Sequence, residues 1–80
     1  MKSVYLIYKT DTWHSYNSRE LIGVGTTPKR AIEICVRRAK NEDHRISDVQ
    51  LELLKSIKQT QGYDGEGEFH FEEMKTDILL

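Results

Sequence analysis

The spacing of apolar residues changes along the chain and predicts three strands. Residues 3–10, "SVYLIYKT", are rich in β-branched and aromatic side chains, which are typical of a strand. Residues 20–27, "ELIGVGTT", predict a second strand that two glycines weaken. Residues 68–76, "EFHFEEMKT", alternate with Phe69 and Phe71 on one side, so we expect a third strand with one solvated face.

Two segments between the second and third strands have helical spacing instead. Thr27 and Pro28 fit the N-cap and first position of a helix that ends near Lys40. Ser47 and Gln50 form a capping box at the start of a second helix. The stripes expected to be buried are Ala31, Ile32, Cys35, Val36 and Ala39 in the first helix, and Val49, Leu53, Leu54 and Ile57 in the second.

The order strand, strand, helix, helix, strand predicts a two-layer α+β domain, a three-stranded sheet with two helices on one face. The first strand is apolar on both faces, which favours a central place and the strand order 2-1-3, with 1-2-3 as the alternative. Two antiparallel helices would return the chain to its starting end, so we expect the third strand to run parallel to the first. The loops at residues 11–20 and 59–68 would then lie at opposite ends of the sheet.

The chain is short, and its 80 residues predict one small domain. A domain of this size buries roughly 60% of the surface that its unfolded chain exposes, so packing or self-association must stabilise it. Its one cysteine excludes an internal disulfide and suits a reducing compartment. The first apolar run is too short for a membrane span or a secretory signal. We therefore expect a soluble, cytoplasmic protein that does not bind a membrane.

The formal net charge of −1 conceals an uneven distribution. Residues 1–40 carry eight Lys or Arg against three Asp or Glu, whereas residues 41–80 carry four against ten. Such a split indicates charges that pair within one fold, head-to-tail association, or a basic face for a polyanion. We favour pairing within the fold.

The loop "DTWHSYNSRE", residues 11–20, contains the chain's single tryptophan and is long for a hairpin connection. One interpretation is that Trp13 or Tyr16 folds back and seals the small core. The other is a binding loop, because Trp, Tyr and Arg dominate protein-binding hot spots. The residues predicted to contact a partner protein are Trp13, His14, Tyr16 and Arg19, with Tyr63 at the tip of the glycine-rich loop as a second candidate.

The uncovered face of the sheet is a second candidate surface. If the helices cover the face that carries Val4, Leu6 and Tyr8, then Tyr5 and Ile7 point outwards. An exposed sheet face with an Ile and a Tyr favours self-association, so a homodimer is one expectation.

Nucleic-acid binding is the alternative function. The cations off the apolar stripe of the first helix are Lys29, Arg30, Arg37, Arg38 and Lys40. They could contact phosphates, but a solvated basic face has the same pattern. The acidic second half and the lack of a known module signature make nucleic acid the weaker expectation.

The sequence offers little for catalysis or metal binding. His14 and Ser15 are adjacent, so their side chains diverge, and no oxyanion-hole motif stands nearby. The calcium-loop spacing that begins at Asp64 fails later, where Phe69 replaces glycine and Lys75 replaces glutamate. Glu68, His70 and Glu72 share one strand face and could hold zinc, but a solvated strand face looks the same. Cys35 lies on the buried stripe, which is typical of a core residue and not of a reactive thiol. From these observations together we expect no enzyme, no metal and no cofactor.

The stretches "VYLIYKTDTWHSY" and "KQTQGYDGEGEF", with a short apolar end, resemble a loose family of small uncharacterised proteins of bacteria, phages and mobile elements. The resemblance implies a stand-alone accessory protein and supplies no catalytic residues. Together these observations predict a non-enzymatic protein-interaction module.

Overall fold

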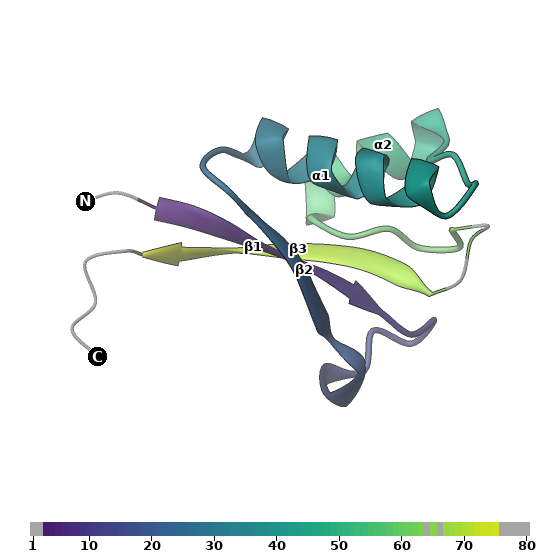
Figure 1. Cartoon of the computed structure of the whole chain (residues 1–80), viewed down its shortest axis with the longest axis horizontal. Helices are drawn as coiled ribbons and strands as arrows, with labels where there is room; N and C mark the ends of the chain where they lie inside the picture. Colours follow the sequence, from purple (N-terminus) through teal and green to yellow (C-terminus); the bar gives the residue numbers. More distant parts are fainter. Residues whose placement is uncertain (1–2, 64, 66, 76–80) are drawn as a thin grey trace.

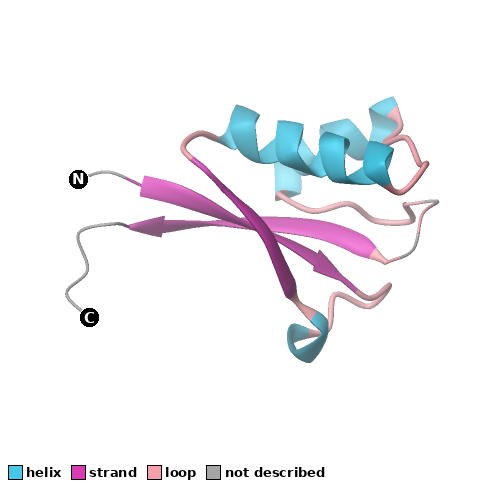
Figure 2. Ribbon diagram, viewed as in Figure 1, coloured by secondary structure: helices cyan, strands magenta, loops and turns pink. Residues whose placement is uncertain are grey.

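The computed structural model describes residues 3–63, 65 and 67–75, and its strands and helices follow the predicted order (Figure 1). The predicted apolar end at residues 77–80 lies outside the described residues. The elements are β1 (Ser3–Thr10), a 3-10 turn η1 (Tyr16–Ser18), β2 (Glu20–Gly25), α1 (Pro28–Asn41), α2 (Asp48–Ile57) and β3 (Glu68–Lys75). The sheet has the order β2-β1-β3, and both helices lie on one side of it (Figure 2). The predicted α+β class and the preferred strand order are confirmed.

Local signals start both helices. The Thr27 side chain accepts a hydrogen bond from the Arg30 amide at the start of α1. Ser47 accepts one from the Gln50 amide at the start of α2. The Gln50 side chain does not complete the capping box, because its amide nitrogen donates to the Gln61 carbonyl at 2.6 Å and its oxygen accepts from the Gln61 amide at 2.9 Å. Gln50 thereby joins α2 to the segment that leads into β3.

The core lies between the sheet and the helices. Its buried residues are Ile7, Ala31, Cys35, Ala39, Ile46, Leu54, Tyr63, Phe69 and Phe71. Glycine lets α1 approach β2 closely, because a Cβ atom at Gly23 would lie 3.0 Å from Ile34. Two phenylalanines from β3 and small residues from α1 thus fill most of a thin core.

The predicted direction of β3 is wrong. β3 runs antiparallel to β1, with Ser3 opposite Lys75 and Thr10 opposite Glu68. The reason lies in residues 58–60, of which residues 59 and 60 belong to the predicted loop 59–68. They run beside β3, where the Thr60 amide donates to Phe69 and the Phe71 amide donates to Lys58. Because residues 58–60 run along the sheet first, β3 starts from the opposite end, so loop 11–19 and the described residues 61–63, 65 and 67 lie at the same end.

The predicted faces of β1 are also reversed. Ile7 is fully buried in the core beneath the helices, and Tyr5 packs against that core. Neither is available on the uncovered face as the self-association hypothesis required. Because both faces of β1 are apolar, alternation alone could not assign them.

The uncovered face carries different side chains. On β2, Leu21 and Val24 stand opposite Tyr8 and Leu6 of β1, and they are 54% and 53% exposed. On β3, Met74 stands opposite Val4 and is 38% exposed. This part of the uncovered face is therefore apolar. Val4 and Leu6 were expected beneath the helices, whereas no face was predicted for Leu21, Val24 and Met74.

The buried stripe of α2 also differs from the prediction. Val49 and Ile57 are 68% and 47% exposed, whereas Gln50 and Leu54 face the core. Gln50 is polar and was not expected inside, and its bonds to Gln61 account for its position.

Of the helices that the structure describes, none has both the length and the apolar composition to cross a bilayer.

Candidate functional site

Loop 11–19 is held by its own side chains. The Asp11 carboxylate accepts hydrogen bonds from the amides of Trp13 and Ser15 at 3.0 and 2.9 Å. The Ser18 hydroxyl accepts from the Asp11 amide and donates to the Ser15 carbonyl. The bonds from the Trp13 and Ser15 amides stabilise the charged carboxylate, and the one from Ser15 contributes most to lowering the pKa of Asp11. The loop therefore has a defined backbone shape at the end of β1.

His14 fastens this loop to the rest of the domain. Its Nε2 atom lies 2.8 Å from the Thr60 carbonyl oxygen, and since a carbonyl only accepts, Nε2 carries the hydrogen. The Nδ1 atom lies 3.3 Å from the Thr10 hydroxyl. His14 has a φ of 55°, a left-handed conformation that these contacts maintain. His14 thus holds the loop in place, and its predicted contact with a partner stays a prediction.

Arg19 also joins the loop to the sheet, on the face that the helices leave uncovered. Its guanidinium lies between two aromatic rings, 4.9 Å from that of Tyr16 and 5.3 Å from that of Tyr8. It also forms an ion pair with Glu72 at 3.7 Å and approaches His70 at 3.5 Å. Sequence reasoning named Arg19 and Tyr16 but missed their supports in β1 and β3, because only the pairing of those strands brings them together.

The two large aromatic residues of the loop point into solvent. Trp13 is 82% exposed and Tyr16 is 78% exposed. Neither ring seals the core, so the lid interpretation is wrong. In Figure 1 the η1 turn lies on the side of the sheet away from the helices.

Tyr63, the second predicted contact residue, is not at a loop tip. It is 6% exposed and packs edge-on against Phe69, with ring centroids 5.3 Å apart. The Glu68 carboxylate accepts from the Thr60 hydroxyl and from the amides of Gly62 and Tyr63, and these bonds draw the segment inwards. Tyr63 therefore belongs to the core, and its ring does not stand at a loop tip as its predicted role in binding required.

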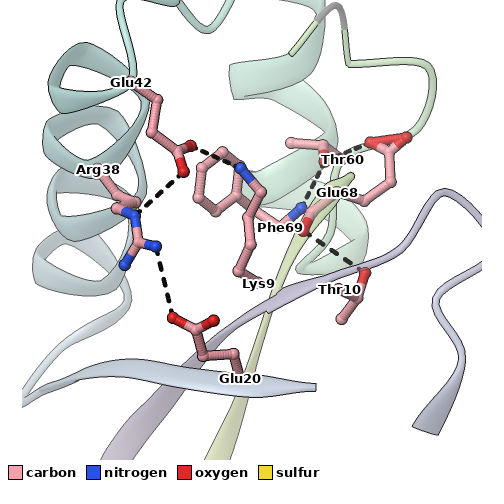
Figure 3. Close-up of polar contacts among 8 residues, drawn as sticks. All are labelled: Lys9, Thr10, Glu20, Arg38, Glu42, Thr60, Glu68 and Phe69. Atoms are coloured by element: carbon pink, nitrogen blue, oxygen red, sulfur yellow. Dashed lines mark hydrogen bonds and ion pairs between the residues drawn. The ribbon is translucent and has the colours of Figure 1, made fainter. Parts of the chain in front are cut away.

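A chain of ion pairs lies beside the loop on the helix side (Figure 3). Lys9 contacts Glu42 at 2.7 Å, Glu42 contacts Arg38 at 3.4 Å, and Arg38 contacts Glu20 at 3.4 Å. The Lys9 ammonium also lies 4.5 Å from the centre of the Phe69 ring. Hydrogen bonding to Lys9 is the main reason that the pKa of Glu42 is lowered.

A polar cleft of about 490 Å³ opens beside this chain of ion pairs. Its lining is Lys9, Thr10, Asp11, Thr12, Ser18, Glu20, Arg38, Glu42 and Gly67. Both of its cations already contact carboxylates. The cleft therefore offers neutralised charges and hydroxyl groups rather than an unpaired cation for an anionic ligand.

The basic residues of α1 divide into two groups. Arg30 and Arg38 form ion pairs, Arg30 with Glu33 and Arg38 with Glu20 and Glu42. The other three cations, Lys29, Arg37 and Lys40, are exposed, as is Arg30. The nucleic-acid alternative stays a prediction, and the pairing of two of its five residues does not favour it.

The residues considered for metal and thiol chemistry lie as follows. Among the described residues, no three His, Cys, Asp or Glu side chains gather closely enough to hold a metal ion. Glu68 was expected on the solvated face of its strand with His70 and Glu72, but it is 3% exposed. Asp64 and Glu66 lie outside the described residues. Cys35 is buried, and burial raises the pKa of its thiol to about 12, so at neutral pH it is not a thiolate.

Comparisons with protein-family models, curated proteins and solved structures give no match for this chain.

Proposed function

We propose that this chain is a non-enzymatic protein-interaction module that binds a partner protein through loop 11–19. The observation that carries the proposal is the 82% exposure of Trp13 on a loop with a fixed backbone. An indole in water costs free energy that a partner's apolar pocket would recover.

The fixed loop supports this assignment energetically. Binding costs less when the contact residues do not have to be ordered first. Asp11, His14 and Ser18 hold the loop, so ordering falls mainly on the side chains of Trp13 and Tyr16. Tyr16 rests on Arg19, which further limits its freedom.

The surroundings of the two rings suit the rim of an interface. Arg19 and Glu72 form a partly exposed ion pair beside Tyr16. Polar groups around aromatic anchors are typical of specific, reversible interfaces. We therefore expect a partner surface with an apolar pocket for the indole and polar groups around it.

The first test compares Trp13→Ala and Tyr16→Ala with wild type and with the control Val49→Ala. Val49 is also exposed, at 68%, but lies on α2. Immobilised proteins capture a partner from lysate, and the partner is identified by mass spectrometry and purified. We expect it to bind wild type and Val49→Ala equally, and the two loop variants at least about tenfold more weakly.

The same variants separate binding from stability. Because Trp13 is exposed, Trp13→Ala should change the free energy of unfolding by less than about 0.5 kcal/mol. Native Trp13 fluorescence should be red-shifted and accessible to acrylamide. Equal capture by all variants, nuclease-sensitive capture, or a loss of several kcal/mol in Trp13→Ala would each contradict the proposal.

A further inference from the structure

The two edges of the sheet are treated differently. The outer edge of β3 is covered by residues 58–60, through the bonds from Thr60 to Phe69 and from Phe71 to Lys58. Among the described residues, β2 pairs with β1 and with no other strand. The outward amides and carbonyls of β2 are therefore open to another strand.

The composition of β2 does little to prevent such pairing. Its sequence, "ELIGVG", contains one charged residue and neither lysine nor proline, which commonly protect edge strands. A bulge occurs opposite Ile7 and Tyr8 of β1. Through it, Leu21 and Val24 both lie on the uncovered face, each more than half exposed.

We propose that β2 pairs antiparallel with β2 of a second copy of this chain, which extends the two sheets into one. The best register places Leu21 of each copy opposite Val24 of the other. These two side chains share a face of the sheet. The Leu21–Val24 contact would therefore form twice, once on each side of the two-fold axis. A shift of one residue would lose both contacts.

Charge complementarity favours a second copy in this register. Glu20 of one copy stands opposite Gly25 of the other, so no like charges oppose each other. The Gly25 end lies beside the start of α1, where a Cβ atom at Gly25 would be 3.3 Å from the Cβ of Arg30. A hollow of about 210 Å³ at this end is lined by Arg30, Glu33 and Arg37 among others, two cations and one carboxylate, so its formal charge is positive. The side chain of Glu20, which is 63% exposed beside Arg38, would reach this end of the other copy.

Analytical ultracentrifugation of the purified chain tests the association. We expect twice the monomer mass of 9.4 kDa at high concentration, with dissociation on serial dilution. Val24→Lys should give monomer at every concentration, whereas Val49→Lys, the same change at an exposed site on α2, should remain dimeric. Monomeric wild type at its highest soluble concentration, or equal effects of the two variants, overturns the proposal.

Cross-linking tests the register without depending on Val24→Lys. Leu21→Cys and Val24→Cys are prepared separately and oxidised alone and as a mixture. Opposed residues of antiparallel strands have Cα atoms about 4.5–5.5 Å apart, a span that a disulfide accepts. We expect covalent dimer mainly in the mixture, because only there does a cysteine at position 21 stand opposite a cysteine at position 24. Cys35 is buried and should not compete for these thiols. Equal yields from each variant alone would indicate stacked sheet faces and overturn edge pairing. Since neither test touches Trp13, failure here leaves the proposed function of loop 11–19 standing.

Discussion

The backbone of Gly67 lies against the carbonyl oxygen of Thr10, where β3 begins beside the end of β1. Its φ is +78°, a left-handed conformation that favours glycine. A Cβ atom at this position would collide with the Thr10 carbonyl. At this residue, both the backbone angle and the available space exclude a side chain.

Gly67→Ala should therefore destabilise the domain by about 3 kcal/mol or more, from the left-handed backbone and the collision together. Gly62→Ala is the matched control. Its φ is +75°, but the nearest atom to its Cβ would be 4.0 Å away, on Gln50. We expect only about 1–2 kcal/mol there. Urea unfolding measures both, and equal losses would show that the approach to Thr10 is unimportant.

His70 is the residue whose protonation should affect stability near neutral pH. It stacks on Tyr8 and lies near Arg19, Glu72 and His14. Burial is the main cause that lowers its pKa below the usual 6.5, with Arg19 and His14 adding to the shift and Glu72 opposing it. The unfolded chain therefore binds a proton at His70 at a higher pH than the folded one.

It follows that stability is complete above about pH 6.5 and falls as the pH decreases towards the lowered pKa of His70. His70→Gln should reduce the slope of unfolding free energy between about pH 7.5 and 5. Urea titrations at several pH values measure that slope. The carboxylates of Asp11 and Glu42 titrate below this window, because their pKa values are lowered. An unchanged slope in the variant would rule out this role for His70.

Among the elements, α1 is joined to β1 by the ion pair of Lys9 and Glu42. The Lys9 side chain is 10% exposed and that of Glu42 is 34% exposed. Glu42 is the residue that caps the end of α1, and the ion pair thus holds this end of the helix close to the end of β1 (Figure 3). An ammonium in so closed a position depends on its carboxylate more than a surface lysine does.

Glu42→Gln should accordingly reduce the free energy of unfolding by about 1–3 kcal/mol, because Lys9 then lacks a charged partner. Glu33→Gln, which removes the exposed Arg30–Glu33 pair, should cost less than about 0.5 kcal/mol. Thermal unfolding of both variants at neutral pH measures the difference. Similar midpoints for both variants would mean that the Lys9 pair behaves as an ordinary surface pair.

At the scale of the whole molecule, the sequence predicted the number and lateral order of the strands and the bounds of β1, but it extended β2 to residue 27 rather than to Gly25. It did not predict the direction of β3, because "KQTQ" has no alternating pattern and pairs with β3 through backbone groups. It also did not assign the faces of β1. Lys9 shares the buried face of Ile7 because Glu42 neutralises it. A contact between residues so distant along the chain leaves no local signal.

The candidate site was predicted in part for the same reason. The aromatic content of loop 11–19 identified it as a surface of interest, but exposure of Trp13 was one of two interpretations. Tyr63 was predicted at a loop tip, but the hydrogen bonds that Glu68 accepts hold its segment in the core. The uneven charge of the two halves proved informative, since Lys9 and Arg19 of the first half contact Glu42 and Glu72 of the second.

The position of β1 between the other two strands has a consequence for biosynthesis. β1 leaves the ribosome before the other strands of the sheet, yet each of its residues has a partner in β3, from Ser3 with Lys75 to Thr10 with Glu68. Phe69 and Phe71 arrive with that strand, so during translation Ile7 lacks much of its covering until residue 75 has emerged. Contacts between such distant residues slow folding and leave an apolar strand exposed meanwhile. Until β3 has been synthesised, the nascent chain therefore carries an apolar strand with one unpaired edge.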